Sequence, residues 1–261
     1  RIPLSELAER LGGSVSPNEI INLQAEILGF ATDSRDVRPG DLFIAIRGAN
    51  VDGHEFVAKA LELGAAASLV EREVEWPHIL VDEVVGALAR MALSFRRDFA
   101  GPVVGITGSA GKSSAKEFVA AALSPLGRVM KTEGNRNTEY TAPLMWAELR
   151  APSFPTERRG LGVERAAAVV VEMGMRGLGQ IRHLASFSKP TIALITNIGV
   201  AHLSELGSRE NIAKAKAEIF EALPLGSPPP TPSSLEKGGG LESGSAIFWA
   251  EDDFADFLRQ Q

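Results

Sequence analysis

The sequence predicts an α/β protein with a small N-terminal α/β domain and a larger central domain, whose mostly parallel sheet is flanked by helices. The chain has 261 residues, of which 44% are hydrophobic, and this is enough for two separate cores. After Gly101, apolar segments rich in Val, Ile and Ala alternate with helical patterns, which is typical of a parallel sheet covered on both faces. Before that point the elements are shorter and more mixed. We therefore expect domains over residues 1–98 and 99–226.

Residues 1–98 are expected to fold as the small domain. Leu4, Leu7 and Leu11 lie on one face of a helix that should end at Gly12 and Gly13. The further elements expected here are a strand over 41–46, a helix over 55–63, and strands over 67–71 and 78–82.

The central domain should contain four strands and four helices in alternation. The strands are expected in VVGIT (103–107), RVMKT (128–132), AAAVVVE (166–172) and TIALITN (191–197). The helices are expected from Lys112, near 138–149, near 178–187, and over 210–223.

Two further segments follow the central domain. Residues 227–244 are rich first in proline and then in glycine, which is the composition of a flexible linker. Residues 245–261 are long enough for one strand and one short helix. They belong either to the end of the central domain or to a piece of a further domain, and the sequence leaves both options open.

The composition argues against several classes of protein. A net charge of −6 provides no basic face for nucleic acid. No apolar run approaches the eighteen or so residues of a spanning helix, so we expect no membrane insertion. Cysteine is absent, which indicates a reducing compartment and therefore a cytoplasmic protein. We expect a monomer.

A phosphate-binding loop is predicted at VVGITGSAGKSS (103–114), where an apolar strand runs into a glycine-rich turn and then a helix. Backbone N–H groups at such a turn attract anions, a lysine adds a point charge for the terminal phosphates, and a serine can hold Mg²⁺. The general motif requires a glycine at position 106, where this chain has Ile106. The alternative is a plain glycine turn. The expected nucleotide contacts are Thr107, Gly108, Ser109, Ala110, Gly111, Lys112, Ser113 and Ser114.

The variant TGSAGKSS resembles the ATP loop of the Mur ligase family, and four further motifs agree with it in order. These are TDSR (32–35), GANVDGHEF (48–56), EGNRNTEYTAP (133–143), and EMGMRGLGQI (172–181) followed by TNIGVAHLSELGS (196–208) and KAKAEI (214–219). The resemblance extends from Thr32 to Ile219. The pair Lys116–Glu117 and the EMGM…GQI segment are most similar to the members that add D-alanyl-D-alanine.

The resemblance implies an ATP-dependent amide ligase of peptidoglycan precursor synthesis, and thus of cell wall biogenesis, cell shape and division. Its donor would be UDP-N-acetylmuramoyl-tripeptide, activated as an acyl phosphate, and its acceptor D-alanyl-D-alanine. ATP and Mg²⁺ would be the cofactors. The family has a C-terminal ligase domain that nothing after Leu223 can build, so we expect it to be absent and this chain to be weak or inactive alone.

The resemblance also implies roles for residues at the carboxyl ends of the predicted strands. Glu172 and His202 would hold Mg²⁺ together with Ser113, and Asn197 would contact the nucleotide. The alternatives are a solvated strand end for Glu172 and a hydrogen-bonded structural residue for His202. Lys216 would carry a carbamate.

For Lys216 the alternative is a solvated helix face. There it would pair with Glu210 or Glu218, as we expect for the neighbouring Lys214. With Lys112, Glu172 and His202, Lys216 completes the expected catalytic set.

The donor is expected to contact two groups of residues. The UDP end would lie near Ser34, Arg35 and the turn of Asp52, Gly53 and His54, in an N-terminal UDP-sugar-binding domain. The sugar and peptide would face Thr132, Asn135, Asn137 and Thr138. Three other functions stay open: a Mur ligase that adds a single amino acid, a non-catalytic nucleotide- or UDP-sugar-binding fragment, and a P-loop switch protein.

Overall fold

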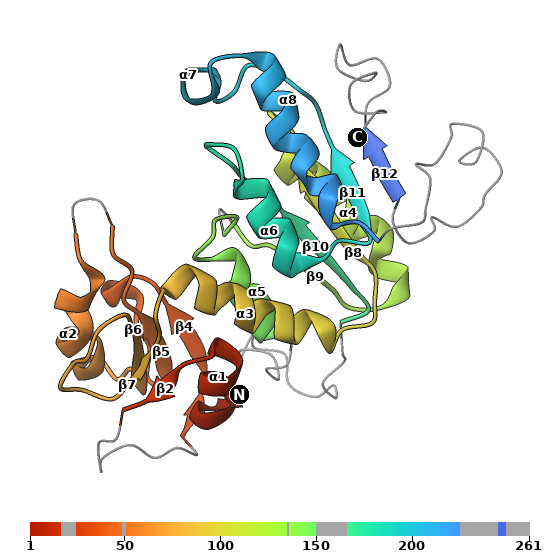
Figure 1. The fold of residues 1–261 in the computed structure, drawn as a ribbon. Helices are drawn as coiled ribbons and strands as arrows, with labels where there is room; N and C mark the ends of the chain where they lie inside the picture. The colour runs from red at the N-terminus through yellow and green to blue at the C-terminus, as the bar shows by residue number, and fades with distance from the viewer. Residues whose placement is uncertain (17–24, 49–50, 135, 150–165, 225–244, 249–261) are drawn as a thin grey trace. The chain divides into compact units, whose positions relative to one another are not determined.

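The computed structural model describes residues 1–16, 25–48, 51–134, 136–149, 166–224 and 245–248 (Figure 1). For residues 245–248 only the backbone is described. Contacts divide the chain into two compact units, one of Arg1–Asp98 with Pro143–Val163 and one of Phe99–Ala142 with Glu164–Gln261. Both are α/β, and the second has a parallel sheet flanked by helices, so the predicted fold class is confirmed.

The first unit is built on a five-stranded sheet. Its order is β2 (Ser14–Val15), β7 (His78–Leu80), β6 (Ala67–Val70), β5 (Asp41–Ile44) and β4 (Gly29–Ala31). The β4, β5, β6 and β7 strands run parallel and β2 is antiparallel. A separate antiparallel pair joins β1 (Ile2–Pro3) to β3 (Glu26–Ile27). The helical elements are α1 (Leu4–Leu11), η1 (Ser34–Asp36), η2 (Gly53–Phe56), α2 (Val57–Glu62) and α3 (Val84–Arg97).

Helix α3 is an element that the sequence analysis did not assign. Glu83 caps its first turn, where the carboxylate accepts the N–H groups of Val85 at 2.7 Å and Gly86 at 2.5 Å. Its buried residues recur at helical spacing. They are Val84, Ala87, Leu88, Met91, Ala92 and Phe95.

The second unit has a parallel sheet of five strands. Its order is β12 (Ser245–Phe248), β11 (Ile192–Ile195), β8 (Val103–Thr107), β10 (Ala168–Glu172) and β9 (Val129–Lys131). The helical elements are α4 (Lys112–Leu123), η3 (Ser124–Leu126), α6 (Gln180–Ser188), α7 (Leu203–Leu206), α8 (Arg209–Ala217) and η4 (Glu218–Ala222). Helix α5 (Ala142–Glu148) belongs to the first unit from Pro143 onward.

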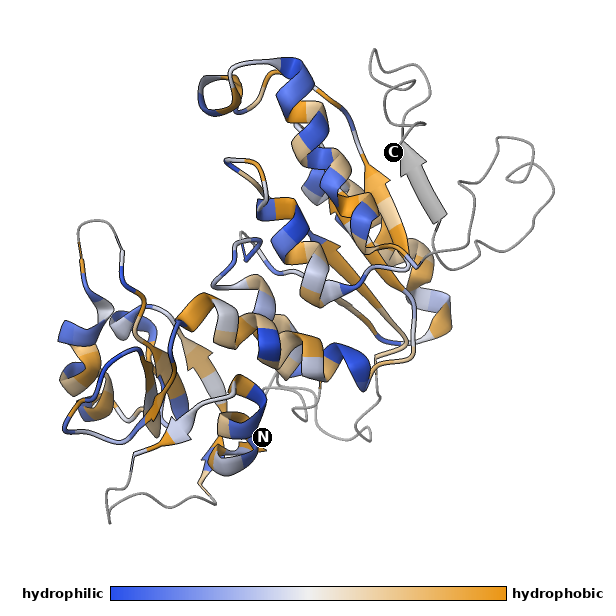
Figure 2. Cartoon of the chain, in the orientation of Figure 1, coloured by the Kyte–Doolittle hydropathy of each residue, from blue (hydrophilic) through white to orange (hydrophobic). Residues whose placement is uncertain are grey.

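Both faces of this sheet are covered. On one face, α4 packs its Ala120 with Val104, Ile106 and Val170 of the strands. On the other face, a side chain placed at Gly105 would meet Ile219 of η4. Every residue of β8 and β10 is therefore buried, and Figure 2 shows the hydrophobic colour along the central strands. This explains why these strands have continuous apolar sequences rather than alternating ones.

Strand β12 decides where residues 245–248 belong, which the sequence left open. It pairs in parallel with β11, with Ser245 opposite Ile192 and Phe248 opposite Ile195. Residues 245–248 therefore form an edge of the central sheet. The predicted linker over 227–244 and the predicted helix after 248 lie outside the described residues. Within the described ranges, no helix has the length and apolar character needed to span a bilayer.

Candidate nucleotide and substrate site

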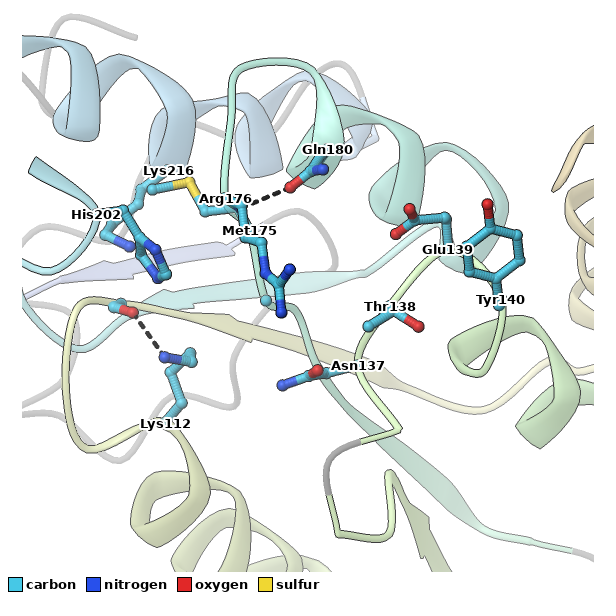
Figure 3. A pocket seen from close by; sticks show the side chains of 12 residues that line it. Lys112, Asn137, Thr138, Glu139, Tyr140, Met175, Arg176, Gln180, His202 and Lys216 are labelled. Carbon is cyan, nitrogen blue, oxygen red and sulfur yellow. Dashed lines mark hydrogen bonds between the residues drawn. The ribbon is translucent and has the colours of Figure 1, made fainter. Parts of the chain in front are cut away.

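The loop between β8 and α4 has the geometry of an anion site. Gly111 adopts a left-handed conformation with φ 76°, and α4 begins at Lys112 with no side chain capping its first N–H groups. Such N–H groups and the helix dipole favour a bound anion. The Lys112 Nζ donates to the carbonyl of Gly108 at 3.0 Å (Figure 3). A neutral carbonyl is a weak partner for an ammonium, so a phosphate can displace it.

The segment after β11 fixes this loop. The Oδ1 of Asn197 accepts the N–H groups of Ser109 at 3.0 Å and Ala110 at 2.9 Å. The Thr196 hydroxyl donates to the carbonyl of Ala110 at 2.6 Å. A Cβ at Gly108 would lie 1.8 Å from Thr196 Oγ1, so the close approach requires glycine. Asn197 therefore shapes the loop directly.

Glu172 ends β10 beside the loop and is 4% exposed. Its Oε2 accepts the Ser113 hydroxyl at 3.0 Å, and its Oε1 accepts Asn137 Nδ2 at 3.3 Å. Its own N–H donates to Thr132 Oγ1 at 2.8 Å. The interpretation of Glu172 as a solvated strand end is therefore wrong. A carboxylate and a hydroxyl at this spacing are oxygen donors of the kind that Mg²⁺ prefers.

Lys116 belongs to the same cluster, and the sequence analysis gave it no role. Its Nζ lies 3.3 Å from Oε2 of Glu172, and both side chains are 5% exposed. Lys116 follows Lys112 by four residues, so the two lie on one face of α4. The four-residue spacing from Lys112 is the sequence signal that could have identified Lys116. Burial of the pair was not visible, since it depends on strand β10.

A cavity of about 450 Å³ opens beside the loop (Figure 3). Five predicted site residues with side chains line it: Lys112, Asn137, Thr138, His202 and Lys216. Four polar residues that were not predicted also line it: Glu139, Tyr140, Arg176 and Gln180. The cavity lies within the second unit.

Lys216 is buried at the cavity, with 1% of its surface exposed. Among the described residues, it makes no hydrogen bond or ion pair. Burial, and secondly the charge of Lys112, lower the pKa of Lys216 to about 7. The solvated-face alternative is therefore wrong for Lys216, whereas Lys214 on the same helix is exposed.

Comparison with known proteins decides the family. The Mur ligase family catalytic domain matches residues 26–129, and the Mur ligase middle domain matches residues 106–228. The chain belongs to the Mur ligase family.

Several similar proteins are named UDP-N-acetylmuramoyl-tripeptide--D-alanyl-D-alanine ligase. The protein from Synechocystis sp. is 41% identical over 78% of this chain and 44% of its own length. The protein from Bacillus subtilis is 40% identical over 77% of this chain and 42% of its own length. The chain thus spans less than half the length of these relatives.

Two solved structures are also similar. MurF from Acinetobacter baumannii has a TM-score of 0.80 at 30% identity, covering 99% of this chain and 51% of the other. MurF ligase from Thermotoga maritima, solved in complex with ADP, has a TM-score of 0.68 at 32% identity, covering 90% and 48%.

His202 reaches the cavity of this Mur ligase chain from the loop before α7. Its φ of 68° is left-handed, which is uncommon for a residue other than glycine. In the described part of the chain, no hydrogen bond joins His202 to Ser113 or Glu172. Nor do the described His, Asp and Glu residues form a group of three or more that could hold a metal. Its role as a Mg²⁺ ligand stays a prediction.

The turn of Asp52, Gly53 and His54 uses its polar groups internally. The N–H of Gly53 donates to Ile46, and the N–H of His54 donates to Asp52 Oδ1 at 3.0 Å. The buried ring of His54 accepts the N–H of Glu71 through Nε2 at 3.0 Å, so its Nδ1 donates to Asp52 at 2.6 Å. A contact of this turn with the donor's phosphates stays a prediction.

The remaining donor contacts also stay predictions. Arg35 is exposed and pairs with Asp33, whose pKa this hydrogen bonding lowers to about 2, while Ser34 lies between them in η1. Thr138 shares a hydrogen bond with Thr141 at 3.0 Å. Asn135 lies outside the described residues.

Proposed function

We propose that this chain carries the nucleotide and donor sites of a ligase that joins D-alanyl-D-alanine to UDP-N-acetylmuramoyl-tripeptide in peptidoglycan precursor synthesis. The names and identities of the relatives support this assignment. The observation that carries it is the phosphate-type loop facing the buried Glu172, with an adjoining cavity large enough for the end of a peptide.

ATP would bind with its terminal phosphates at Gly108–Ser114 and the start of α4. Lys112 would leave the carbonyl of Gly108 and contact these phosphates. Ser113 and Glu172 would hold Mg²⁺, which neutralises phosphate charge during transfer. Mg²⁺ fits this donor set because both protein ligands are oxygens.

The donor would enter the cavity with its terminal carboxylate toward the loop. A carboxylate oxygen attacks the γ-phosphorus, the bond to the ADP oxygen breaks, and ADP leaves with the electron pair. The amine of D-alanyl-D-alanine then attacks the acyl carbon, phosphate leaves, and the nitrogen loses a proton as the amide forms. No protein nucleophile is needed, so the work of Lys112 and the loop is positioning and charge stabilisation.

Lys216 would carry a carbamate. An amine reacts with CO₂ in its neutral form, and the lowered pKa of Lys216 makes that form abundant near neutral pH. The product is an anion that shares the cavity with His202 and Lys112.

The absence of cysteine and the use of ATP support a cytoplasmic location.

Calorimetry tests the proposal on this chain. We expect UDP-N-acetylmuramoyl-tripeptide to bind more tightly than the corresponding dipeptide, and ADP to bind in a Mg²⁺-dependent manner. Lys112→Met should weaken ADP binding at least tenfold, whereas Lys214→Met, at an exposed position, should not. A preference for the dipeptide would reassign the chain to a ligase acting one step earlier. Binding of neither peptide would refute a donor site in this chain.

A further inference from the structure

Glu218 is a buried carboxylate to which the reaction described so far gives no role. Only 4% of its surface is exposed. It does not belong to the described residues that line the site cavity, and lies instead at a second cavity of about 480 Å³ together with Arg182, Lys214 and Glu221. A buried carboxylate is stable only where hydrogen bonds or opposite charges compensate it. The groups that compensate Glu218 therefore indicate what it does.

The partners of Glu218 lie at the start of helix α6, 36 and 39 residues earlier in the chain. Its Oε1 accepts the N–H of Gly179 at 2.7 Å, and its Oε2 accepts the N–H of Arg182 at 3.1 Å. The Arg182 guanidinium lies 3.7 Å from the same carboxylate. The first N–H groups of a helix have no partners within it, and the helix dipole favours a negative charge there. Both oxygens of Glu218 are thus used at one helix end.

A cap from so far along the chain does more than stabilise the helix. The usual cap is the side chain of the N-cap residue itself, but here that residue is Gly179, which has none. The side chain of Gln180 instead accepts the N–H groups of Arg176 at 2.6 Å and Gly177 at 3.2 Å. A local cap would stabilise α6 alone. The carboxylate of Glu218 also joins α6 to η4, and through η4 to the end of α8.

The two segments that Glu218 joins both reach the site. Residues 173–179 connect β10 to α6, and Met175 and Arg176 of this 173–179 loop line the cavity. Lys216 lies just before Glu218 and lines the same cavity from α8. Figure 3 shows the loop side chains and Lys216 reaching this space from different elements. The hydrogen bonds of Glu218 therefore determine how the loop is spaced from Lys216.

The nucleotide end of the site has supports of its own. The loop before α4 is fixed by Asn197 and Thr196, which follow β11. These hydrogen bonds do not involve Glu218 or the 173–179 loop. A change at Glu218 should therefore leave nucleotide binding intact and disturb only the part of the site that faces the 173–179 loop. This separation distinguishes a positioning role from a general contribution to stability.

We propose that Glu218 is a positioning residue, which fixes the 173–179 loop relative to the helix that carries Lys216. This role rests on the proposed function, in which the donor peptide enters the cavity that the loop lines. A wall that is already ordered binds a ligand more tightly than one that must be ordered first, because less entropy is lost on binding. Glu218 lies outside the cavity, so its replacement acts on the donor through the loop.

Calorimetry on the whole 261-residue chain measures the effect. Glu218→Gln keeps the shape of the side chain but replaces one accepting oxygen by an NH₂ group, which cannot accept an N–H. Binding of UDP-N-acetylmuramoyl-tripeptide should weaken about tenfold, while Mg²⁺-dependent ADP binding stays as in wild type. Glu218→Asp keeps the charge but is one methylene shorter, so it should lose part of the peptide affinity. It provides the same comparison if the glutamine variant does not fold.

Amide hydrogen exchange followed by NMR gives a local signature of the same role. In Glu218→Gln, the amides of Gly179 and Arg182 should exchange faster, because one carboxylate oxygen no longer accepts them. The amides of Ser109 and Ala110 in the nucleotide loop should exchange as in wild type. Unchanged exchange at Gly179 and Arg182 would overturn the positioning role.

Glu221→Gln is the matched control, since Glu221 lies in the same η4, is half exposed and pairs with the same Arg182. It should bind the peptide and ADP as wild type does. Glu218 variants that bind the peptide like wild type, or that lose peptide and ADP binding to the same extent, would overturn the positioning role and leave the proposed function standing. Failure of wild type to bind the tripeptide would overturn both.

Discussion

Replacing Lys116 by methionine tests how the Glu172 site is held together. The change removes a buried ammonium and keeps a side chain of similar length. Glu172 then remains as a buried carboxylate without its ion-pair partner. We expect a large loss of stability, because an uncompensated buried charge costs more than a missing surface contact.

The expected loss follows from the geometry. At an N–O distance of 3.3 Å, an effective dielectric constant of about 20 gives an attraction of roughly 5 kcal/mol. Part of this lost free energy is regained, because the variant no longer buries an ammonium. Glu172 also keeps its hydrogen bonds from Ser113 and Asn137. A net loss of about 3 kcal/mol is reasonable, which corresponds to about 10 °C in unfolding temperature.

Thermal and urea unfolding with and without Mg²⁺ measure the effect. Mg²⁺ would supply positive charge to the same carboxylate, so it should stabilise Lys116→Met more than wild type. Lys131→Met is the matched control, since Lys131 pairs with Glu117 in an exposed ion pair beside the same helix. Exposed pairs contribute little, and this control should unfold close to wild type.

A double variant separates charge from packing. Adding Glu172→Gln to Lys116→Met removes the stranded charge, so the double variant should regain part of the lost stability. The reasoning is refuted if Lys116→Met is as stable as Lys131→Met. It is also refuted if the double variant is simply the sum of two losses, because the ammonium would then act through packing alone.

Four further predictions concern Lys216 and the loop. Without CO₂, the unfolding free energy of wild type should rise between pH 7 and 10.5, because Lys216 binds a proton in the unfolded state that it has lost in the folded state. Urea unfolding at a series of pH values measures this rise, and Lys216→Met should lack it. With ¹³C-bicarbonate, wild type should show a carbamate carbon signal by NMR that Lys216→Met lacks, and its absence in wild type would contradict the modification. Asn197→Ala should weaken ADP binding about tenfold by calorimetry, since two loop N–H groups lose their acceptor, and unchanged binding would refute the shaping role. Gly108→Ala should lose ADP binding while Gly177→Ala, with open space around it, retains it.

The sequence predicted the elements whose signal is local. Strands β8, β10 and β11 are long apolar runs, and the loop before α4 is set by its own glycines. The strands β1, β2 and β3 have two residues each, which is too short for a period, and only their pairing defines them. Helix α3 has buried residues at helical spacing and a capping Glu83, so its sequence carries a local signal that is sufficient to predict it.

The site residues also divide into those with a local sequence signal and those that depend on distant contacts. Ser113 was predicted from the phosphate-loop pattern, and Glu172 from its place at a strand end together with the resemblance to the Mur ligases. The structure joins the two side chains by a hydrogen bond, although 59 residues separate them. Lys116, Arg176 and Glu139 were missed because their importance comes from a buried partner or a shared cavity. No neighbouring sequence encodes such a surrounding.

Three lysines at this site show how the fold assigns different chemistry to one residue type. Lys112 contacts a neutral carbonyl, so it can move to a phosphate. Lys116 is bound to a buried carboxylate, so it stays in place. Lys216 makes no hydrogen bond or ion pair among the described residues and has a lowered pKa, so it can be neutral and nucleophilic.

The charge of each of these lysines affects the others. The charge of Lys112 is one reason why the pKa of Lys216 falls, so the Lys112 ammonium favours the neutral form of the Lys216 amine. Once Lys216 becomes a carbamate, the same charge attracts it instead of repelling it. Lys116 already compensates Glu172, so the carbamate would be an added anion in a cavity that Lys112 and Arg176 also line. Lys112→Met should therefore lower carbamate occupancy at a fixed bicarbonate concentration, and an unchanged ¹³C signal in that variant would show that the balance comes from elsewhere.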